Sequence, residues 1–283
     1  MAGLLSGLEA FGLSNLDNIE VYEKEKQEQK GKPEEQKSPE MLESEMLFDK
    51  TYECPVCGKT VKARTVRAGK AKLAGTDLDI RPRYEQIEPI KYDVVLCPKC
   101  GFAALSRFFQ YVTPTQKKAI ISKISKNFKP PRETEVYTFE EAVERYKMAL
   151  LSAIVKGAKP SEKAYICLKA GWLIRSWSES LNASMPGAAQ KKQELLEQED
   201  AFLNNAFEGF ISARQSEGFP MCGMDEMTVD YLLAALAVRF AKFDVASKMI
   251  AGILGSTAAN PRMKDKARDL KDIVMKKMKE SKE

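Results

Sequence analysis

The chain has 283 residues, of which 44% are hydrophobic and 30% are charged, so it has enough apolar material for one large folded domain or two ordinary ones. It has no histidine, which excludes histidine-based acid–base catalysis, Ser-His-Asp and Cys-His nucleophiles, and mixed Cys/His metal sites. The net charge of +5 is unevenly distributed, because residues 1–53 hold six Lys/Arg against thirteen Asp/Glu, whereas residues 54–130 hold sixteen against five.

The first fifty residues consist of a short apolar segment and a charged one. Residues 1–22 predict an amphipathic segment with apolar side chains at Leu4, Leu5, Leu8, Phe11, Leu13 and Leu16. We interpret it either as a segment that docks on its own protein or as a tail that binds a partner or a second copy. Residues 23–50 are charged, rich in glutamine and poor in apolar side chains, so they predict a solvated linker, with an exposed helix as the alternative.

The N-terminal sequence lacks the basic residues and the long apolar stretch of a secretory signal, and no apolar run in the chain is long enough to span a bilayer. We therefore expect a cytoplasmic protein without a membrane span. In that reducing compartment, paired cysteines more often bind metal or do redox work than form structural disulfides.

Four of the six cysteines form two C-P-x-C-G motifs within residues 51–112. Cys54 and Cys57 lie in ECPVCGK, and Cys97 and Cys100 lie in LCPKCGFA. In each motif two thiolates of one tight turn reach the same ion, and the glycine permits the positive φ that closes the turn. The nearby stretches TVKARTV and YDVVL have the pattern of strands. Together, the two motifs predict a small β module, similar to a zinc ribbon, in which these four cysteines hold one metal ion.

The predicted metal is a structural Zn²⁺, because four thiolates close its coordination shell and a catalytic zinc keeps one position open for water. An iron site similar to rubredoxin uses the same double motif, but such electron carriers tend to be acidic and this module is basic. A dithiol redox pair needs only one motif, and disulfides need an oxidising compartment. Of the remaining cysteines, we expect Cys167 to pack in a helical core and Cys222 to lie in a loop.

The basic residues around the motifs predict nucleic acid as an alternative partner. The candidate phosphate contacts are Lys59, Lys62, Arg64, Arg67, Lys70, Lys72, Lys99 and Arg107, and the candidate stacking groups are Tyr84, Tyr92, Phe102 and Phe108. Four thiolates and one Zn²⁺ offset only part of this positive charge. The acidic residues 1–53 are an alternative cover for it.

Two acidic residues in TDLDIRPRY, Asp77 and Asp79, have two interpretations. They are an acid pair or ligands of a hard metal, or they are loop charges that pair with Arg81 or Arg83, and we favour the pairing. The sequence contains no P-loop, no dinucleotide-binding fingerprint and no nucleophile elbow.

From about residue 114 the apolar positions recur with a helical period, so residues 113–283 predict an all-α domain and the fold as a whole is mainly α. Thr138 and Glu141 fit a capping box that opens the first helix. Five further helices are expected after GAKP, at about 190–216, from about Asp225, from Phe243 and from Pro261. The small residues Ala234, Ala237 and Ala246 have spacings similar to those of tetratricopeptide repeats, so we predict repeat-like packing, with an ordinary helical bundle as the alternative.

The stretches ECPVCGK and RPRYEQIEPIKYDVVLCPKCGFAA, with the helices that follow, resemble the bacterial family called domain of unknown function 2225 over about residues 50–255. The resemblance implies a zinc-ribbon-like module fused to tetratricopeptide-like helices in a bacterial cytosolic protein. It implies metal ligation by the four cysteines of the motifs and supplies no activity.

We therefore predict a non-catalytic zinc-binding protein whose helical domain acts as an interaction or scaffold module for a protein or peptide partner. The first alternative is a nucleic-acid-associated protein that contacts phosphates through the basic module. The second is a rubredoxin-like iron electron carrier. An enzyme is the weakest hypothesis, because the sequence lacks the acid–base and nucleophile machinery described above.

Overall fold

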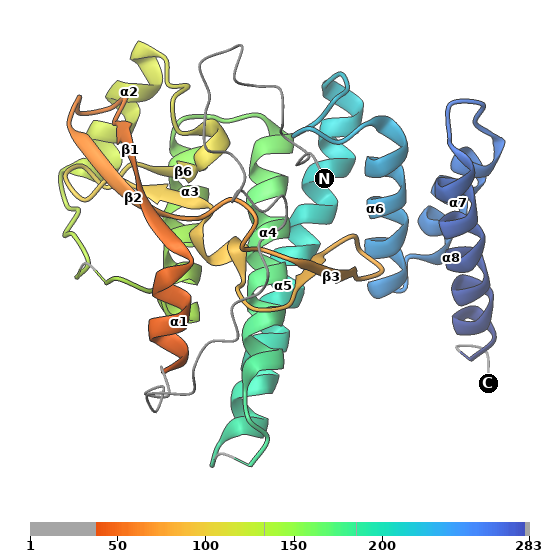
Figure 1. Ribbon diagram of the computed structural model, residues 1–283. Coiled ribbons are helices and arrows are strands. Elements are labelled where there is room, and N and C mark those ends of the chain that lie inside the picture. The colour runs from red at the N-terminus through yellow and green to blue at the C-terminus, as the bar shows by residue number, and fades with distance from the viewer. Residues whose placement is uncertain (1–37, 133, 185, 281–283) are drawn as a thin grey trace, which may run out of the picture. The chain divides into compact units, whose positions relative to one another are not determined.

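The structure is a computed structural model, and it describes residues 38–132, 134–184 and 186–280 (Figure 1). The predicted segment 1–22 and the first part of the predicted linker lie outside the described residues. The strands are β1 (Leu47–Glu53), β2 (Thr60–Val66), β3 (Leu73–Thr76), β4 (Pro82–Tyr84), β5 (Val94–Leu96) and β6 (Ala103–Leu105). The α-helices are α1 (Pro39–Glu45), α2 (Pro114–Ile120), α3 (Phe139–Val155), α4 (Pro160–Ser180), α5 (Ala188–Ser216), α6 (Glu226–Arg239), α7 (Phe243–Gly255) and α8 (Pro261–Glu280). The shorter helical turns are η2 (Pro89–Tyr92), η3 (Ser106–Phe108) and η4 (Ile121–Ser125).

The strands form three separate antiparallel hairpins, β1–β2, β3–β4 and β5–β6. The predicted strand TVKARTV is β2, in which Val61 and Ala63 are buried while Lys62 between them is exposed. The strand predicted within YDVVL is β5, and all three of its residues are buried. Both predictions are confirmed. The pairing of Glu53 with Thr60 in the first hairpin places the ECPVCGK motif in its loop.

The helices follow the predicted boundaries because their end signals are local. The Glu141 amide donates to Thr138 Oγ1 at 3.1 Å, and the Thr138 amide donates to Glu141 Oε2 at 2.7 Å, so the predicted capping box opens α3. Asp225 caps α6 by accepting from the Thr228 amide at 2.8 Å. Proline at the first position opens α8, where its missing N–H is not needed. The prediction of a mainly α-helical protein with a small β module is confirmed.

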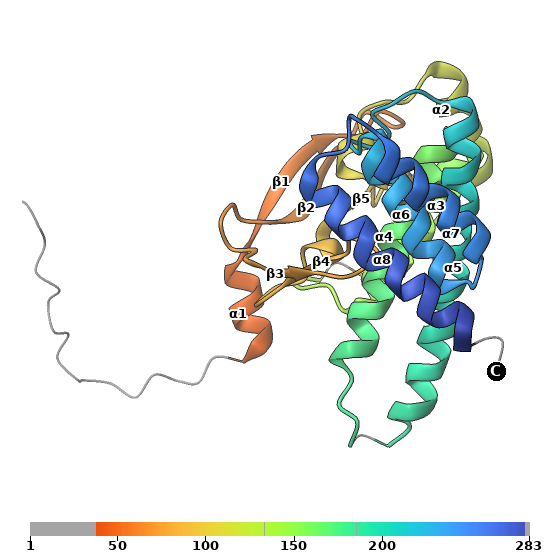
Figure 2. The same cartoon turned by 90° about the vertical axis from the view of Figure 1, so that its right-hand side faces the viewer.

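Each helix from α3 to α8 packs against the next one along the chain, and the pair α4–α5 and the pair α7–α8 lie side by side in both views (Figures 1 and 2). Two glycines allow α4 and α5 to approach closely. A Cβ on Gly171 would lie 2.6 Å from Leu203, and a Cβ on Gly209 would lie 2.8 Å from the Cβ of Ala164. The short connections therefore join neighbouring helices, as expected.

Buried side chains form two clusters. The larger one joins α3–α8 with β5 and β6. The smaller one surrounds the four motif cysteines and contains Tyr52, Phe102 and Phe109 together with Ile120 of α2 and Ile124 of η4. Met148 of α3 packs against both clusters. The division into a module at 51–112 and a helical domain at 113–283 stays a prediction, as does the tetratricopeptide-like character of the helices.

An ionic cluster attaches the β3–β4 hairpin to the helices. Asp77 accepts from Arg81 at 2.6 Å and from Arg83 at 3.4 Å, so the predicted pairing is confirmed for this residue. Asp79 pairs instead with Arg175 of α4 at 2.6 Å. Arg81, although 2% exposed, also pairs with Glu179 of α4 at 2.8 Å. These contacts fix the long excursion between the two cysteine motifs on the surface of α4.

We expect the ion pairs of Asp77 to make stability fall in acid. Burial opposes ionisation of this carboxyl group, but hydrogen bonds from Arg81 and Arg175 outweigh burial and lower its pKa below the ordinary value of 3.8. Such a group stabilises the fold above its unfolded pKa, and the stabilisation is lost as the pH falls through the folded pKa. Urea unfolding from about pH 5 down to about pH 2 should show this loss, and Asp77→Asn should flatten it. An equally steep fall in the variant would contradict the assignment.

Within the described ranges 38–132, 134–184 and 186–280, none of the helices combines the length and the apolar character that crossing a bilayer requires.

Candidate metal centre

Both C-P-x-C-G motifs form the loop of an antiparallel hairpin, β1–β2 for the first motif and β5–β6 for the second. The two loops have matching hydrogen bonds. The Gly58 amide donates to the Cys54 carbonyl at 2.8 Å, and the Gly101 amide donates to the Cys97 carbonyl at 3.0 Å. In each loop the amide of the first cysteine donates to the carbonyl of the residue after the glycine, at 3.0 and 2.8 Å. The two glycines have φ values of 67° and 74°, which confirms the predicted use of the left-handed region to close these turns.

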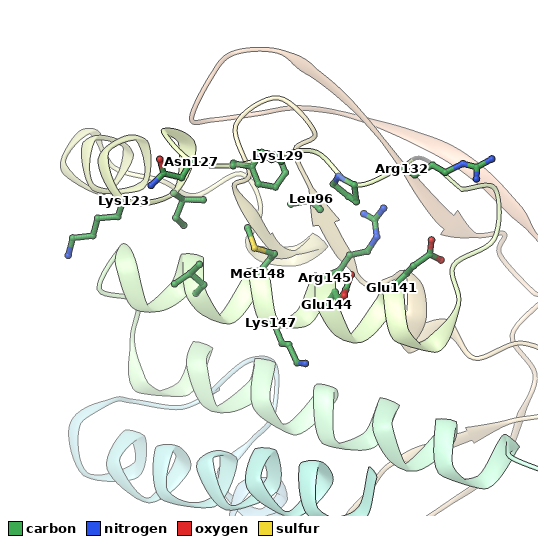
Figure 3. Close-up of a pocket in the computed structure, with 14 residues that line it drawn as sticks. Leu96, Lys123, Asn127, Lys129, Arg132, Glu141, Glu144, Arg145, Lys147 and Met148 are labelled. Atoms are coloured by element: carbon green, nitrogen blue, oxygen red, sulfur yellow. The ribbon is translucent and has the colours of Figure 1, made fainter. Parts of the chain in front are cut away.

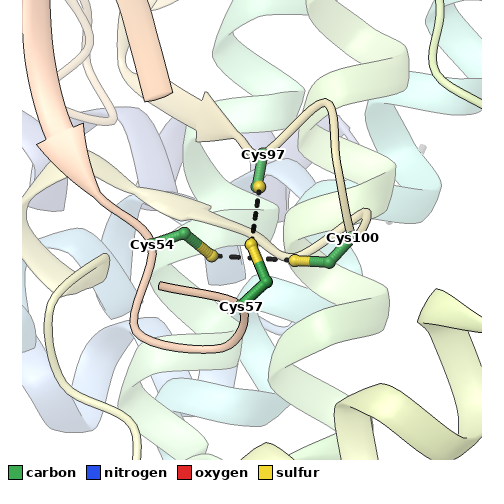
Figure 4. Close-up of side chains that lie close together, drawn as sticks. All are labelled: Cys54, Cys57, Cys97 and Cys100. Atoms are coloured by element: carbon green, nitrogen blue, oxygen red, sulfur yellow. Dashed lines mark hydrogen bonds between the residues drawn. The ribbon is translucent and has the colours of Figure 1, made fainter. Parts of the chain in front are cut away.

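The four motif cysteines meet between the two hairpins, and their side chains converge on one point (Figure 4). Cys54 Sγ lies 3.6 Å from Cys100 Sγ, and Cys57 Sγ lies 3.6 Å from Cys97 Sγ. All four sulfur atoms lie within 4.8 Å of one another. A tetrahedral ion with metal–sulfur bonds of about 2.3 Å has sulfur–sulfur edges of about 3.8 Å. The cluster therefore has the dimensions of a four-sulfur metal site.

The groups around the sulfur atoms shift the pKa values of two motif cysteines in opposite directions. Hydrogen bonds from the thiols of Cys100 and Cys54 lower the pKa of Cys97 to about 2, and the amides of Lys99 and Cys100 add to this effect. Hydrogen bonds to Cys54 and Cys97, followed by burial, raise the pKa of Cys100. Four neighbouring thiolates repel one another, so a cation at the centre is what permits all four to ionise.

Residues from later parts of the chain support the second loop. Ser125 of η4 donates from Oγ to the Cys100 carbonyl at 2.8 Å. The Phe128 side chain lies directly against Gly101. The Ala103 amide donates to Ser152 Oγ of α3 at 3.2 Å. No sequence motif connects these partners, so the sequence pattern explained Gly101 by its φ angle and missed the close approach of Phe128.

The two motif glycines provide a matched pair of substitutions. A Cβ on Gly101 would lie 2.5 Å from Phe128 Cγ, whereas a Cβ on Gly58 would meet nothing within 4 Å. Both variants to alanine adopt a strained left-handed backbone, which costs about 1–2 kcal/mol. We expect Gly101→Ala to cost about 1–3 kcal/mol more, because the aromatic ring must move. Urea unfolding of both variants measures the difference. Equal losses of unfolding free energy would show that the Phe128 ring moves aside without an energetic cost.

The two remaining cysteines do not join the cluster. Cys167 is 4% exposed in the core of α4, which confirms its predicted packing role, and burial raises its pKa to about 12. Cys222 lies in the loop before α6 and donates from Sγ to the Ser161 carbonyl at 3.4 Å. Burial raises its pKa to about 11. Both thiols are therefore protonated near neutral pH, which argues against a role as nucleophile.

The basic residues named from the sequence divide into free and engaged groups. Arg64 pairs with Asp49 at 2.9 Å, and Arg107 donates to the Cys222 carbonyl at 2.6 Å. The other lysines of that set are exposed, and no ion pair engages them within the described residues; they are Lys59, Lys62, Lys70, Lys72 and Lys99. Tyr92 and Phe102 are 5% and 0% exposed. The expectation that these two rings stack on bases is therefore wrong. Phe102 packs in the small cluster around the motif cysteines, and Tyr92 packs in the larger cluster, where its ring centroid lies 5.1 Å from that of Tyr137.

The fold and the cluster define a mainly α-helical protein with a small β module whose four cysteines could hold a metal ion. Residues 47–274 match the model of the family described as "Uncharacterized protein conserved in bacteria (DUF2225)", and the chain belongs to this family. The resemblance noted from the cysteine motifs is thereby confirmed.

A curated relative from Borreliella burgdorferi, which carries the name "Uncharacterized protein", is 29% identical over 144 residues. The similarity covers 42% of this chain and 50% of the relative, so the match spans about half the length of that protein. No solved structure matches the chain.

Proposed function

We propose that the chain is a non-catalytic zinc-binding protein in which Cys54, Cys57, Cys97 and Cys100 hold one structural Zn²⁺. The observation that carries this proposal is the convergence of four sulfur atoms from two hairpin loops within 4.8 Å. Four thiolates leave no position for a reacting water. Three of these residues are almost fully buried, with Cys97 0% exposed. This burial shields the sulfur atoms from solvent and from molecules dissolved in it.

Zinc is favoured over iron by the charge around the site, since rubredoxin-like electron carriers tend to be acidic. Exposed lysines lie within or next to both loops, at Lys59 and Lys99. Elemental analysis of reduced protein that has never met a chelator should give about one zinc atom per chain. One iron atom per chain would support the electron-carrier alternative, and neither metal at a stoichiometric level would refute the site.

The helical domain at 113–283 is, in this proposal, an interaction or scaffold module with tetratricopeptide-like packing that binds a protein or peptide partner. The sequential packing of α3 to α8, in which each helix contacts the next, supports a repeat-like arrangement. A cytoplasmic location is part of the same proposal, because the thiolate site requires reduced cysteines.

Nucleic acid binding through the basic module is the second candidate, and the five exposed lysines without ion pairs among the described residues favour it. If these lysines contact phosphates, the affinity for mixed RNA or DNA should fall steeply between low and physiological salt. Replacing Lys59, Lys62 and Lys99 together by glutamine should reduce the salt slope by roughly one unit per lost contact. Absence of binding at low salt would exclude this candidate and leave the zinc site unaffected.

A further inference from the structure

A groove of about 540 Å³ lies between α3 and the segment that follows η4, beside the second cysteine loop (Figure 3). Its size falls in the range of roughly 300–1,000 Å³ that is typical of ligand sites. Its apolar wall comes from elements that are distant in sequence, namely Leu96 of β5, Ile124 of η4, Phe128, Met148 and Leu151. Such a mixture of elements makes this groove a property of the tertiary fold.

The rim of the groove carries an excess of positive charge. Five cationic residues line it, Lys123, Lys129, Arg132, Arg145 and Lys147, against the two acidic residues Glu141 and Glu144. Arg145 extends from α3 toward Arg132, whereas Lys147 points away (Figure 3). Without Lys147 the cations still outnumber the acids, and the acceptor capacity of Glu141 is partly used in the capping box of α3.

These cations have no charged partner in the part of the chain that the structure describes. No ion pair joins Lys123, Lys129, Arg132 or Arg145 to a carboxylate there. Arg145 lies over the ring of Tyr137, whose centroid is 4.0 Å from the guanidinium carbon. Unpaired cations around an apolar wall attract a ligand that carries negative charge and apolar surface together.

The apolar surface extends beyond the groove along α3. Leu151 at the groove edge is 43% exposed, and Ile154, three residues further along the same helix, is 58% exposed. Side chains three apart on a helix lie on one face, so the exposed stripe is longer than the groove. An extended ligand covers this stripe better than a compact small molecule does.

The wall of the groove is held rigidly by the second cysteine loop. Leu96 directly precedes Cys97, and Ser125 beside Ile124 donates to the Cys100 carbonyl at 2.8 Å. Phe128 packs against Gly101. A wall fixed in this way is preorganised, which lowers the entropy cost of binding.

From these observations we infer that the groove binds a peptide segment of a partner protein in which acidic side chains alternate with large apolar ones. The inference rests on the proposed interaction function and names its surface and its partner chemistry. The apolar side chains of the peptide occupy the groove between Phe128 and Met148 and cover Leu151 and Ile154, while its carboxylates meet the lysines and arginines of the rim.

The test is a selection from random peptides of about 16 residues, roughly four helical turns, displayed on phage against the full-length zinc-loaded protein. The peptide enriched most is synthesised and titrated by fluorescence anisotropy against four variants. Leu151→Asp and Lys123→Glu change the groove. Leu196→Asp, whose leucine is also 43% exposed but lies on α5, and Lys271→Glu on α8 are the matched controls. Each variant is checked for zinc content and melting temperature first.

We expect the enriched peptides to be acidic and apolar, and Leu151→Asp to weaken binding about tenfold or more. Lys123→Glu should weaken binding and reduce its salt dependence, whereas both controls should bind as the unchanged protein does. If the enriched peptides bind the groove variants as tightly as they bind the unchanged protein, the assignment of the groove as the binding surface is refuted. The proposed interaction function would remain. No enrichment at all would count against both. Basic enriched peptides, or displacement of the peptide by laurate with an affinity above the peptide's own, would overturn the assignment of the ligand.

Discussion

Cys54→Ser is expected to abolish stoichiometric metal binding and to unfold the β module. The hydroxyl group of serine does not replace a thiolate as a zinc ligand near neutral pH, so three ligands remain. Metal binding at structural zinc sites contributes about 10–16 kcal/mol, which is comparable to the whole stability of a domain, about 5–15 kcal/mol. The small cluster around Tyr52 and Phe109 has too few apolar side chains to replace this contribution.

The unfolding caused by Cys54→Ser should be confined to one part of the chain. The larger cluster, built mainly by α3–α8, contains none of the four motif cysteines, so most of the helical circular dichroism should persist in the variant. Limited proteolysis followed by mass spectrometry should show new cleavage between about residues 47 and 105, the span from β1 to β6. Prolonged treatment of the unchanged protein with a strong chelator should produce the same cleavage pattern.

The other cysteines serve as controls for this prediction. Cys222→Ser should keep one metal atom per chain and nearly the same melting temperature, because Cys222 is half-buried and its thiol donates a weak hydrogen bond that serine can also donate. Cys167→Ser should also keep the metal and lose about 1–3 kcal/mol, the cost of burying a hydroxyl group in an apolar core. Full metal content and an unchanged cleavage pattern in Cys54→Ser would refute the four-thiolate site.

Arg175→Met is expected to cause the second largest loss, about 3–5 kcal/mol of unfolding free energy. The Arg175 guanidinium donates to Asp79 at 2.6 Å, to Asp77 at 3.0 Å and to Glu199 at 2.7 Å. Burial disfavours its charge, but the hydrogen bonds and charges of Asp79 and Glu199 outweigh this and raise its pKa. Asp79 and Glu199 are 6% and 4% exposed, so methionine would leave buried carboxylates without this partner.

The loss should be unequal among the three carboxylates. Asp77 keeps Arg81, and Glu199 keeps Arg239 at 2.9 Å. Within the described residues, the side-chain partner that remains to Asp79 is the indole N–H of Trp172, at 3.1 Å. Adding Asp79→Asn to Arg175→Met should therefore restore part of the stability, and the double-mutant cycle measured by urea unfolding should give a coupling of about 1–3 kcal/mol.

An exposed ion pair provides the control. Arg268 pairs with Asp265 on α8, and both side chains are more than half exposed. Arg268→Met should change the free energy of unfolding by about 0–1 kcal/mol, because water replaces the lost pair. If Arg175→Met costs no more than Arg268→Met, the ionic cluster does not hold the β3–β4 hairpin in place.

Local sequence patterns were sufficient for the ends of several helices and for one face of a strand. The capping box at Thr138, the cap at Asp225 and the proline at Pro261 each mark a helix end by the chemistry of a few adjacent residues. The alternation in β2 marks one buried face. Such signals depend on backbone geometry within one or two turns, so they can be read without knowledge of the rest of the chain.

Contacts between distant residues could not be derived in this way. Asp79 pairs with Arg175, 96 residues later, although the sequence predicts the nearby Arg81 or Arg83 as its partner. Aromatic character marks Tyr92 and Phe102 as candidate stacking groups, but the larger and the smaller cluster bury them. In both cases the outcome depends on which surfaces pack together, and charge or aromatic character alone does not specify this.

The sequence by itself determined which residues are candidate metal ligands, because the spacing within each C-P-x-C-G turn and the absence of histidine are local facts about donor chemistry. Only the tertiary structure decided that the sulfur atoms of the two turns meet within 4.8 Å. It also decided that η4 and Phe128 support the second turn and form a cationic groove with α3. These features arise from packing between residues that are distant in sequence. The shape of the whole core selects such contacts, so they produce no periodic pattern in the sequence.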